Sequence, residues 1–62
     1  MTLKDYRIYG HAGIEGDTLL EDFHLVSEAI DWAKRYCRND LGGYLSVYVT
    51  DKDGAIYWEK DD

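Results

Sequence analysis

The chain has 62 residues, of which 45% are hydrophobic and 15% aromatic, and its formal net charge at neutral pH is −6. This length allows one domain, residues 1–62, and a domain of this size buries only about 60% of the surface that its unfolded chain exposes. The acidic balance argues against nucleic acid or an anionic membrane as a direct ligand, because phosphate binding requires clustered Lys and Arg.

The cysteine and histidine content removes two common ways of stabilising a small domain. Cys37 is the single cysteine, so no internal disulfide can form, and His11 and His24 stand alone without zinc spacing. No apolar run reaches the roughly 18 residues needed to cross a membrane, and the chain does not open like a signal peptide. We therefore expect a cytoplasmic protein that depends on good packing or on self-association.

The first third of the chain predicts two strands. Residues 4–10, KDYRIYG, alternate along the chain and place Tyr6 and Ile8 on one side. This period of two, with aromatic and β-branched members, is typical of a strand. Residues 11–17, HAGIEGD, predict a loop. Residues 18–23, TLLEDF, predict a weaker strand because two adjacent leucines interrupt the alternation.

The segment LVSEAIDWAKRYCR is the clearest element of the sequence. Its apolar residues at i, i+3, i+4, i+7 and i+11 are Val26, Ala29, Ile30, Ala33 and Cys37. This spacing predicts a helix over residues 26–38 with one buried stripe. Acidic residues in its first half and basic residues in its second half suit the helix dipole, and Asp31 and Arg35 are spaced for an i, i+4 ion pair.

The last third predicts a hairpin whose register depends on the length of its loop. YLSVYVT and AIYWEK predict strands at residues 44–50 and 55–60, joined at DKDG. A three-residue loop would pair Asp51 with Ala55, whereas a four-residue loop would pair Thr50 with Ala55. We expect the four-residue loop, because it gathers the aliphatic residues on one face and a one-residue slip would undo that.

In this register the side chains facing the helix are Leu45, Val47, Val49, Ile56 and Trp58. Tyrosines are expected on the uncovered face of the sheet, and they are Tyr9, Tyr44, Tyr48 and Tyr57. The predicted fold is α+β in the order ββαββ, a four-stranded antiparallel sheet with one helix packed on one face. The tyrosine face is either a solvated sheet surface or a face for binding or self-association, since tyrosine is enriched in interface cores.

The negative charge is concentrated in one part of the sequence. No Lys or Arg lies between residues 8 and 33, and outside this stretch acids and bases are equal in number. The acidic residues of the stretch are Glu15, Asp17, Glu21, Asp22, Glu28 and Asp31. The helix accounts for the last two, so the four that precede it are the better functional candidates. They form either a solubilising face or a surface that imitates a phosphate backbone and occupies a basic site on another protein.

The sequence contains no convincing catalytic or metal-binding motif. His24 lies near Glu21 and Asp22 in composition only, and a chain this short leaves little room for a concave pocket. Cys37 falls on the buried stripe, where a small buried hydrophobe is the usual interpretation. DKDG resembles the start of a calcium loop, but no glutamate stands at the twelfth position from Asp51. We therefore expect no enzyme activity, no cofactor and no bound metal.

Two hypotheses of different classes follow. One is a protein that binds another protein with a basic site and blocks it, without contacting nucleic acid or membrane itself. The other is a small accessory subunit that forms a homodimer through its tyrosine face. In size and acidity the chain resembles the small inhibitor proteins of phages and mobile elements, including anti-CRISPR proteins that act as DNA mimics. This resemblance implies the first hypothesis, and it assigns no role to any single residue.

Overall fold

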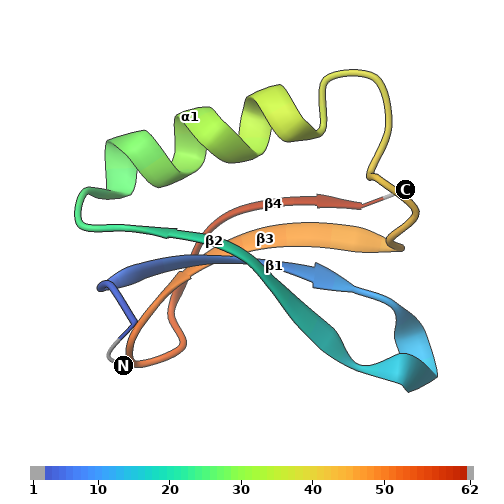
Figure 1. Ribbon diagram of the computed structural model, residues 1–62, viewed down its shortest axis with the longest axis horizontal. Coiled ribbons are helices and arrows are strands. Elements are labelled where there is room, and N and C mark those ends of the chain that lie inside the picture. Colours follow the sequence, from blue (N-terminus) through green and yellow to red (C-terminus); the bar gives the residue numbers. More distant parts are fainter. Residues whose placement is uncertain (1–2, 62) are drawn as a thin grey trace.

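The computed structural model describes residues 3–61. Its elements in chain order are β1 (Tyr6–His11), the 3-10 turn η1 (Gly13–Glu15), β2 (Asp17–Phe23), α1 (Val26–Tyr36), β3 (Ser46–Asp51) and β4 (Ile56–Asp61). The four strands form one antiparallel sheet in the order β2-β1-β3-β4. The helix packs across one face of the sheet and leaves the other face open (Figure 1). The predicted α+β fold with ββαββ order is confirmed.

The core lies between α1 and the two central strands. Its buried members are Ile8, Ala29, Ala33, Cys37, Leu41, Val47 and Val49. Two alanines at the centre of the helix stripe let the helix approach the sheet closely. Full burial of an Ile or Val side chain stabilises the fold by about 1.5–3 kcal/mol, so the central strands carry much of the core's stability. The stripe predicted from the sequence is therefore the buried face of α1.

The β3–β4 hairpin closes with a shorter loop than the sequence predicts. The N–H of Asp51 donates to the carbonyl of Ala55 at 3.1 Å, which leaves residues 52–54 as the loop. The Asp51 carboxylate accepts the N–H groups of Asp53 at 2.8 Å and of Ala55 at 3.0 Å. Gly54 takes a φ of 91°, a conformation that glycine adopts at little cost. The expected four-residue loop is wrong, because these side-chain hydrogen bonds stabilise the tighter turn.

A bulge in β4 then changes the register. Ile56 lies opposite Thr50, whereas Trp58 lies opposite Val49, so Tyr57 is the extra residue. Trp58 therefore packs against the core, as expected. Ile56 does not face the helix as predicted, because it shares the open face with Thr50 and is 57% exposed.

A second bulge explains the adjacent leucines of β2. Ile8 lies opposite Glu21 and Tyr9 lies opposite Leu19, which leaves Leu20 as the extra residue. Leu20 packs against the core, while Leu19 lies beside Tyr9 on the open face. The interrupted alternation in the sequence is therefore the signature of a bulge in an edge strand.

The segment before β3 packs against one end of β1. A Cβ atom on Gly10 would lie 2.6 Å from the ring of Tyr44, so the ring occupies the space that the glycine leaves. The N–H of Leu45 donates to the carbonyl of His11 at 2.8 Å. The Leu45 side chain lies beside Gly13 and is 56% exposed, so it does not face the helix as predicted.

Candidate functional site

Two of the predicted tyrosines lie together on the open face of the sheet. The β1–β3 register places Tyr9 opposite Tyr48, and their rings stack with centroids 5.6 Å apart at 26°. Both side chains are half-buried. Cross-strand aromatic pairs of this kind contribute about 0.2–1 kcal/mol. The pair therefore has a structural role whether or not it also binds a partner.

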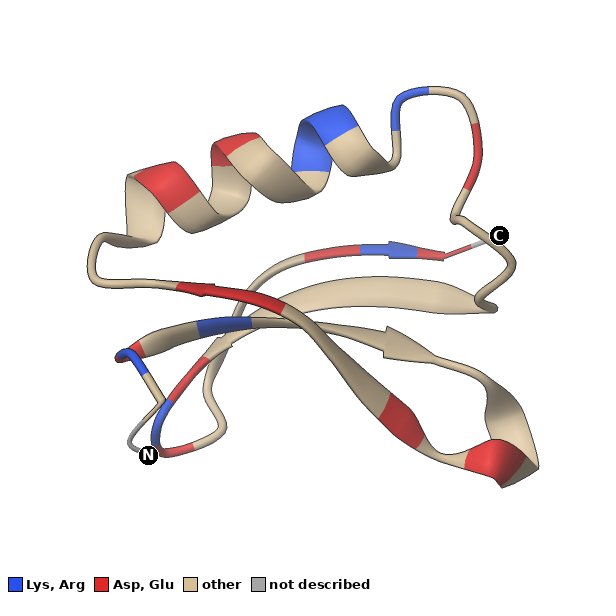
Figure 2. Cartoon of the chain, viewed as in Figure 1, with Lys and Arg blue, Asp and Glu red and all other residues tan. Residues whose placement is uncertain are grey.

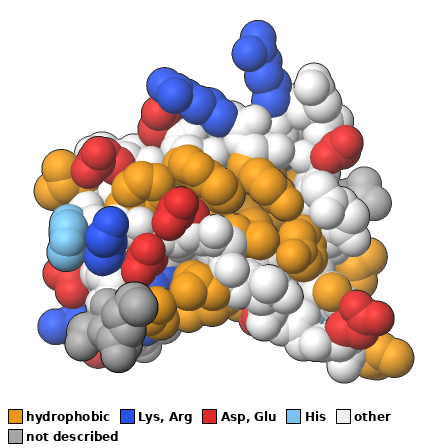
Figure 3. Space-filling model, viewed as in Figure 1, with side chains coloured by type: hydrophobic (Ala, Val, Ile, Leu, Met, Phe, Trp, Pro, Cys, Tyr) orange, Lys and Arg blue, Asp and Glu red, His pale blue; other side chains and the backbone are white. Residues whose placement is uncertain are grey.

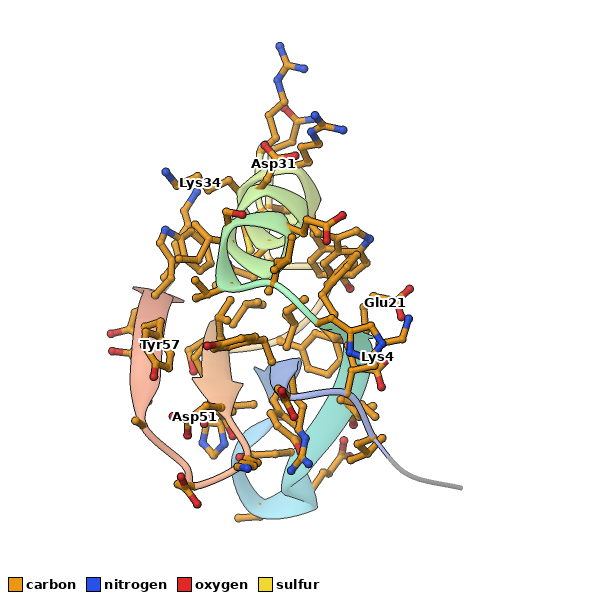
Figure 4. The ribbon with its side chains drawn as sticks, turned by 90° about the vertical axis from the view of Figure 1, so that its left-hand side faces the viewer. Lys4, Glu21, Asp31, Lys34, Asp51 and Tyr57 are labelled. Carbon is orange, nitrogen blue, oxygen red and sulfur yellow. The ribbon has the colours of Figure 1, made fainter. Side chains whose placement is uncertain are left out.

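The other two predicted tyrosines lie on the opposite side, so the four-tyrosine face is wrong. Tyr44 packs against the core beneath the helix. Tyr57 packs edge-on against Tyr6, with centroids 5.6 Å apart at 77°, and its hydroxyl donates to Asp51 at 2.9 Å (Figure 4). Tyr6 and Asp51 are cross-strand partners on the helix side of the sheet. The tighter turn is the physical reason, because pairing of Asp51 with Ala55 puts Ile56 on the open face and Tyr57 on the helix side, and the bulge then keeps Trp58 on the helix side as well.

A polar network that the sequence did not reveal joins β2 to the open-face tyrosines. One carboxylate oxygen of Asp17 lies 2.6 Å from Nδ1 of His11, its cross-strand partner. The other oxygen accepts a hydrogen bond from the hydroxyl of Tyr48. The only sequence signal is that His11 and Asp17 stand symmetrically on either side of a glycine-containing turn. This network ties the end of the β1–β2 hairpin to β3.

The network perturbs both of its acidic groups. The hydrogen bond from Tyr48, followed by the one from His11, lowers the pKa of the Asp17 carboxyl below its usual value. Burial and the neighbouring Asp17 carboxylate raise the pKa of the Tyr48 phenol. Asp17 therefore stays ionised, and Tyr48 stays protonated as its donor.

The remaining acidic residues of the predicted surface are exposed or paired on the surface. Glu15 projects from η1, and Glu28 lies on the outer side of α1. Asp31 forms the predicted i, i+4 ion pair with Arg35, at 3.0 Å between Oδ2 and Nη2. Figure 2 shows the acidic residues spread from η1 along β2 to the first half of α1. The acidic residues thus follow the chain from the tip of the β1–β2 hairpin along β2 and over the outer side of α1, and Figure 4 shows Asp31 at the top of the helix, away from the sheet.

The outer edge of β2 has backbone groups that point out of the sheet. Successive residues of a strand direct their N–H and C=O groups to alternate sides. The N–H of Asp51 points to β4. The backbone N–H and C=O of Thr50 therefore point to β1, and those of its partner Arg7 point to β3. Asp22 lies opposite Arg7 and therefore directs its N–H and C=O away from the sheet. In this structure Glu21 Oε1 accepts that N–H at 3.1 Å.

An aromatic pair overhangs the same edge. Trp32 and Tyr36 stack with centroids 5.1 Å apart at 12°, and both are half-buried. At 100° per residue, Lys34 projects about 160° away from Trp32 around the helix. Figure 4 places Lys34 on the β4 side and Glu21 on the other, so Trp32 and Tyr36 lie on the β2 side. Figure 3 shows hydrophobic side chains gathered between the helix and the sheet on this side.

We call Trp32 and Tyr36 the aromatic shelf, and the shelf together with the outer edge of β2 the β2 flank. Gly42 fits the shelf closely, because a Cβ atom there would collide with the Tyr36 hydroxyl. Asp22 also accepts the backbone N–H of Lys4 at 3.0 Å, and Arg7 directs Nε to the carbonyl of Lys4 rather than to a carboxylate. The flank thus combines outward backbone groups, aromatic surface and carboxylates.

A shallow depression of about 430 Å³ lies elsewhere, where the loop after the helix meets the end of β4. Its lining includes Asp40, Tyr44, Lys60 and Asp61. Lys60 Nζ donates to the carbonyl of Cys37 at 2.9 Å, and Asp40 accepts the N–H of Gly42 at 2.8 Å. The Lys60 ammonium therefore already stabilises the end of the helix, and the Asp40 carboxylate already stabilises the loop that follows it.

Among residues 3–61, no group of three or more His, Cys, Asp or Glu side chains is arranged to hold a metal ion. No helix in the described part of the chain has the length and apolar character needed to span a membrane. Comparison with protein-family models, with curated proteins and with solved structures found no match for this chain.

Proposed function

We propose that this protein acts by binding another protein and performs no chemistry of its own. Its partner has a basic site of the kind that would otherwise hold nucleic acid, and the acidic edge of the molecule occupies and blocks that site. The observation that carries the proposal is the run of carboxylates along the β1–β2 hairpin, with Glu15 in η1 and with Glu21 and Asp22 in the edge strand β2, which together form the acidic edge (Figure 2).

The β1–β2 hairpin supports this proposal because it presents both charge and apolar surface. Ile14 at its tip is fully solvent-exposed, at 106% of the reference area, and Glu15 follows it directly. Exposed carboxylates steer the approach of a basic partner, and an exposed large apolar side chain beside them adds apolar area that the contact buries.

The polar network at Asp17 supports a role without chemistry. Both oxygens of this carboxylate already accept hydrogen bonds, from Tyr48 and from His11. The carboxylate thus serves to join strands, and we assign it a structural role. For this reason the variant designed below leaves Asp17 in place.

The test compares partner capture by the wild-type protein and a neutral variant. The variant carries Glu15→Gln, Glu21→Gln and Asp22→Asn. Tagged protein is exposed to lysate of the source organism at low and high salt, and the captured proteins are identified by mass spectrometry. We expect a basic partner that the wild type captures at low salt and the variant loses, because steering between exposed charges is screened by salt.

The matched control carries Asp53→Asn, Glu59→Gln and Asp61→Asn, which removes the same charge from exposed positions outside the acidic stretch. It should capture the partner as the wild type does. Equal loss in both variants would show that only net charge matters, and equal capture by all three proteins would overturn the proposal.

Self-association through the open sheet face is the second candidate function. The stacked pair of Tyr9 and Tyr48 favours it, together with exposed Leu19 and Ile56 on the same face. Light scattering over a wide concentration range should then show dimers, and Tyr9→Ser should weaken them. A wild-type monomer at high micromolar concentration, at low and high salt alike, would remove this candidate.

A further inference from the structure

We propose that the β2 flank binds an extended basic segment of a partner protein as an added strand. The segment pairs with the outer edge of β2 and turns apolar side chains toward the aromatic shelf and basic side chains toward the open face. This inference rests on the proposed function and specifies its contact: backbone pairing at one named edge.

The outer edge of β2 presents backbone groups for pairing. Asp22 directs its backbone groups out of the sheet, and the β1–β2 register gives Leu19 the same direction, because Leu19 lies opposite Tyr9, which faces β3. Pairing of such groups with a further strand is the standard mode of strand addition. Glu21 Oε1 holds the Asp22 N–H in the free protein, so an incoming basic side chain that attracts this carboxylate also releases the donor.

The surface above this edge is aromatic. A strand added to β2 projects alternate side chains toward the helix side and toward the open face. Those on the helix side meet Trp32 and Tyr36, which are stacked and half-buried. Stacked aromatic rings offer a large apolar area with little side-chain freedom to lose, and such residues are enriched at binding hot spots.

The charge of this edge identifies the occupant. Side chains on the open-face side meet Asp22, and Glu21, which lies opposite Ile8 on the helix side, turns its carboxylate to the Asp22 N–H at the edge. A second copy of this chain, paired β2 to β2, would bring these carboxylates against their own counterparts. Lys4 lies near Glu21 (Figure 4) and competes for it, but it belongs to the segment before β1. A basic segment therefore fits this edge and a second copy does not.

The other edge of the sheet differs in its charge and in the side chain that the helix places above it. The exposed residues Glu59, Lys60 and Asp61 of β4 alternate in charge. Lys34 lies above this edge on the helix (Figure 4), and the aromatic residues on the helix side there, Tyr57 and Trp58, belong to β4 itself. Glu59 lies opposite Tyr48, which faces β1, so the Glu59 N–H points out of the sheet at the β4 edge. Glu59 is thus a matched internal control for Asp22.

The test uses a short peptide of alternating lysine and valine as the probe and the full-length protein labelled for NMR. Saturating peptide should slow hydrogen exchange of the Asp22 amide by at least about tenfold, because its exposed hydrogen bond to the Glu21 side chain is replaced by a backbone hydrogen bond within the sheet. The Glu59 amide should keep its rate. Equal slowing at both edges, or no slowing at Asp22, would overturn the inference.

Two control peptides separate strand pairing from simple charge attraction. A peptide of alternating glutamate and valine should not bind, because it places like charge against β2. A peptide of alternating lysine and proline has the same charge as the probe but lacks half of its backbone donors, and it should bind at least about tenfold more weakly. If it binds as tightly as the probe, strand addition is wrong while an acidic docking surface survives.

A pair of variants completes the design. Glu21→Gln should weaken probe binding by up to about fivefold, as expected for one exposed charge pair, and Glu59→Gln should not change it. If the probe fails but the neutral triple variant still loses its captured partner, the strand mode alone fails. If the probe fails and all variants capture the same proteins, the proposed function fails as well.

Discussion

Asp17 shows how one residue acquires a role that its sequence position does not announce. Its carboxylate joins three strands, since it sits on β2, lies 2.6 Å from His11 on β1 and accepts from Tyr48 on β3. Two hydrogen bonds hold this surface carboxylate in place, and its negative charge already interacts with both donors. It is therefore a weaker candidate for partner binding than Glu15 or Glu21.

The lowered pKa of Asp17 predicts a specific pH dependence of stability. A carboxyl whose pKa is lower in the folded state stabilises that state fully above its unfolded value, about 3.9, and the contribution is lost as the pH falls through the folded value. Below about pH 4 the midpoint of thermal unfolding should thus fall more steeply for the wild type than for Asp17→Asn. Circular dichroism across this range measures both slopes.

Glu15→Gln is the control for this experiment, because it removes an exposed carboxyl from η1 without touching Tyr48 or His11. Its slope should match the wild type. If Asp17→Asn also keeps the wild-type slope, the network does not stabilise the fold and its hydrogen bonds exchange freely with water.

At the scale of elements, the contact between β1 and the segment before β3 depends on Gly10, which has no side chain. The Tyr44 ring fills the space over Gly10, where a Cβ atom would lie 2.6 Å away. Gly10 is itself buried and lies opposite Val47 in the sheet. Glycine is required here by a close approach of a ring and not by an unusual backbone conformation.

Gly10→Ala should therefore destabilise the protein by about 1–3 kcal/mol, the usual cost of overpacking. Urea unfolding measures this free energy. Removing the ring in the double variant Gly10→Ala/Tyr44→Leu should recover part of the loss, compared with the sum of the single changes. A Gly10→Ala protein within about 0.5 kcal/mol of the wild type would show that the ring moves aside at no cost.

The two edge strands share a design, since both carry a bulge and exposed charges. Leu20 is the extra residue of β2 and Tyr57 that of β4. Bulges and charges at an edge oppose uncontrolled pairing with other strands. A strand that pairs with such an edge needs side chains that complement the charge of the edge. On β2 the carboxylates favour basic side chains.

At the scale of the whole molecule, stability depends on a small core closed by a single helix. Cys37 lies in this core, 1% exposed, and burial raises the pKa of its thiol. The Lys60 ammonium caps the helix end by donating to the carbonyl of Cys37. In the folded protein this thiol is therefore both covered and protonated.

Labelling of Cys37 should consequently report on unfolding of the whole molecule. With a soluble thiol reagent we expect slow labelling in buffer and a rate that rises with urea in proportion to the unfolded fraction, because native burial blocks the thiol. Spectrophotometry follows the reaction, and the unfolded protein provides the reference rate. A rate that does not depend on urea would mean that the helix end opens locally.

The sequence alone predicted the elements and the fold class well, for a physical reason. Each element carries its own period: an apolar stripe for α1 and alternation for β1 and β3. The Asp31–Arg35 pair was predictable in the same way, because i, i+4 spacing on a helix fixes neighbourhood without tertiary information. Local spacing thus determined which segments are helix and strand and which face of α1 is buried.

The tertiary structure decided the rest, because it depends on residues far apart in the chain or on one-residue shifts. The Asp51 side chain selected the tighter turn, which moved Ile56 and Tyr57 to faces opposite to those predicted, and the β4 bulge then returned Trp58 to the helix side. A shift of one residue reverses the side chains that follow it until a bulge compensates, so no periodicity could fix these positions. Strand order likewise placed β2 at an edge under Trp32 and Tyr36, and that placement created the flank on which the binding proposal rests.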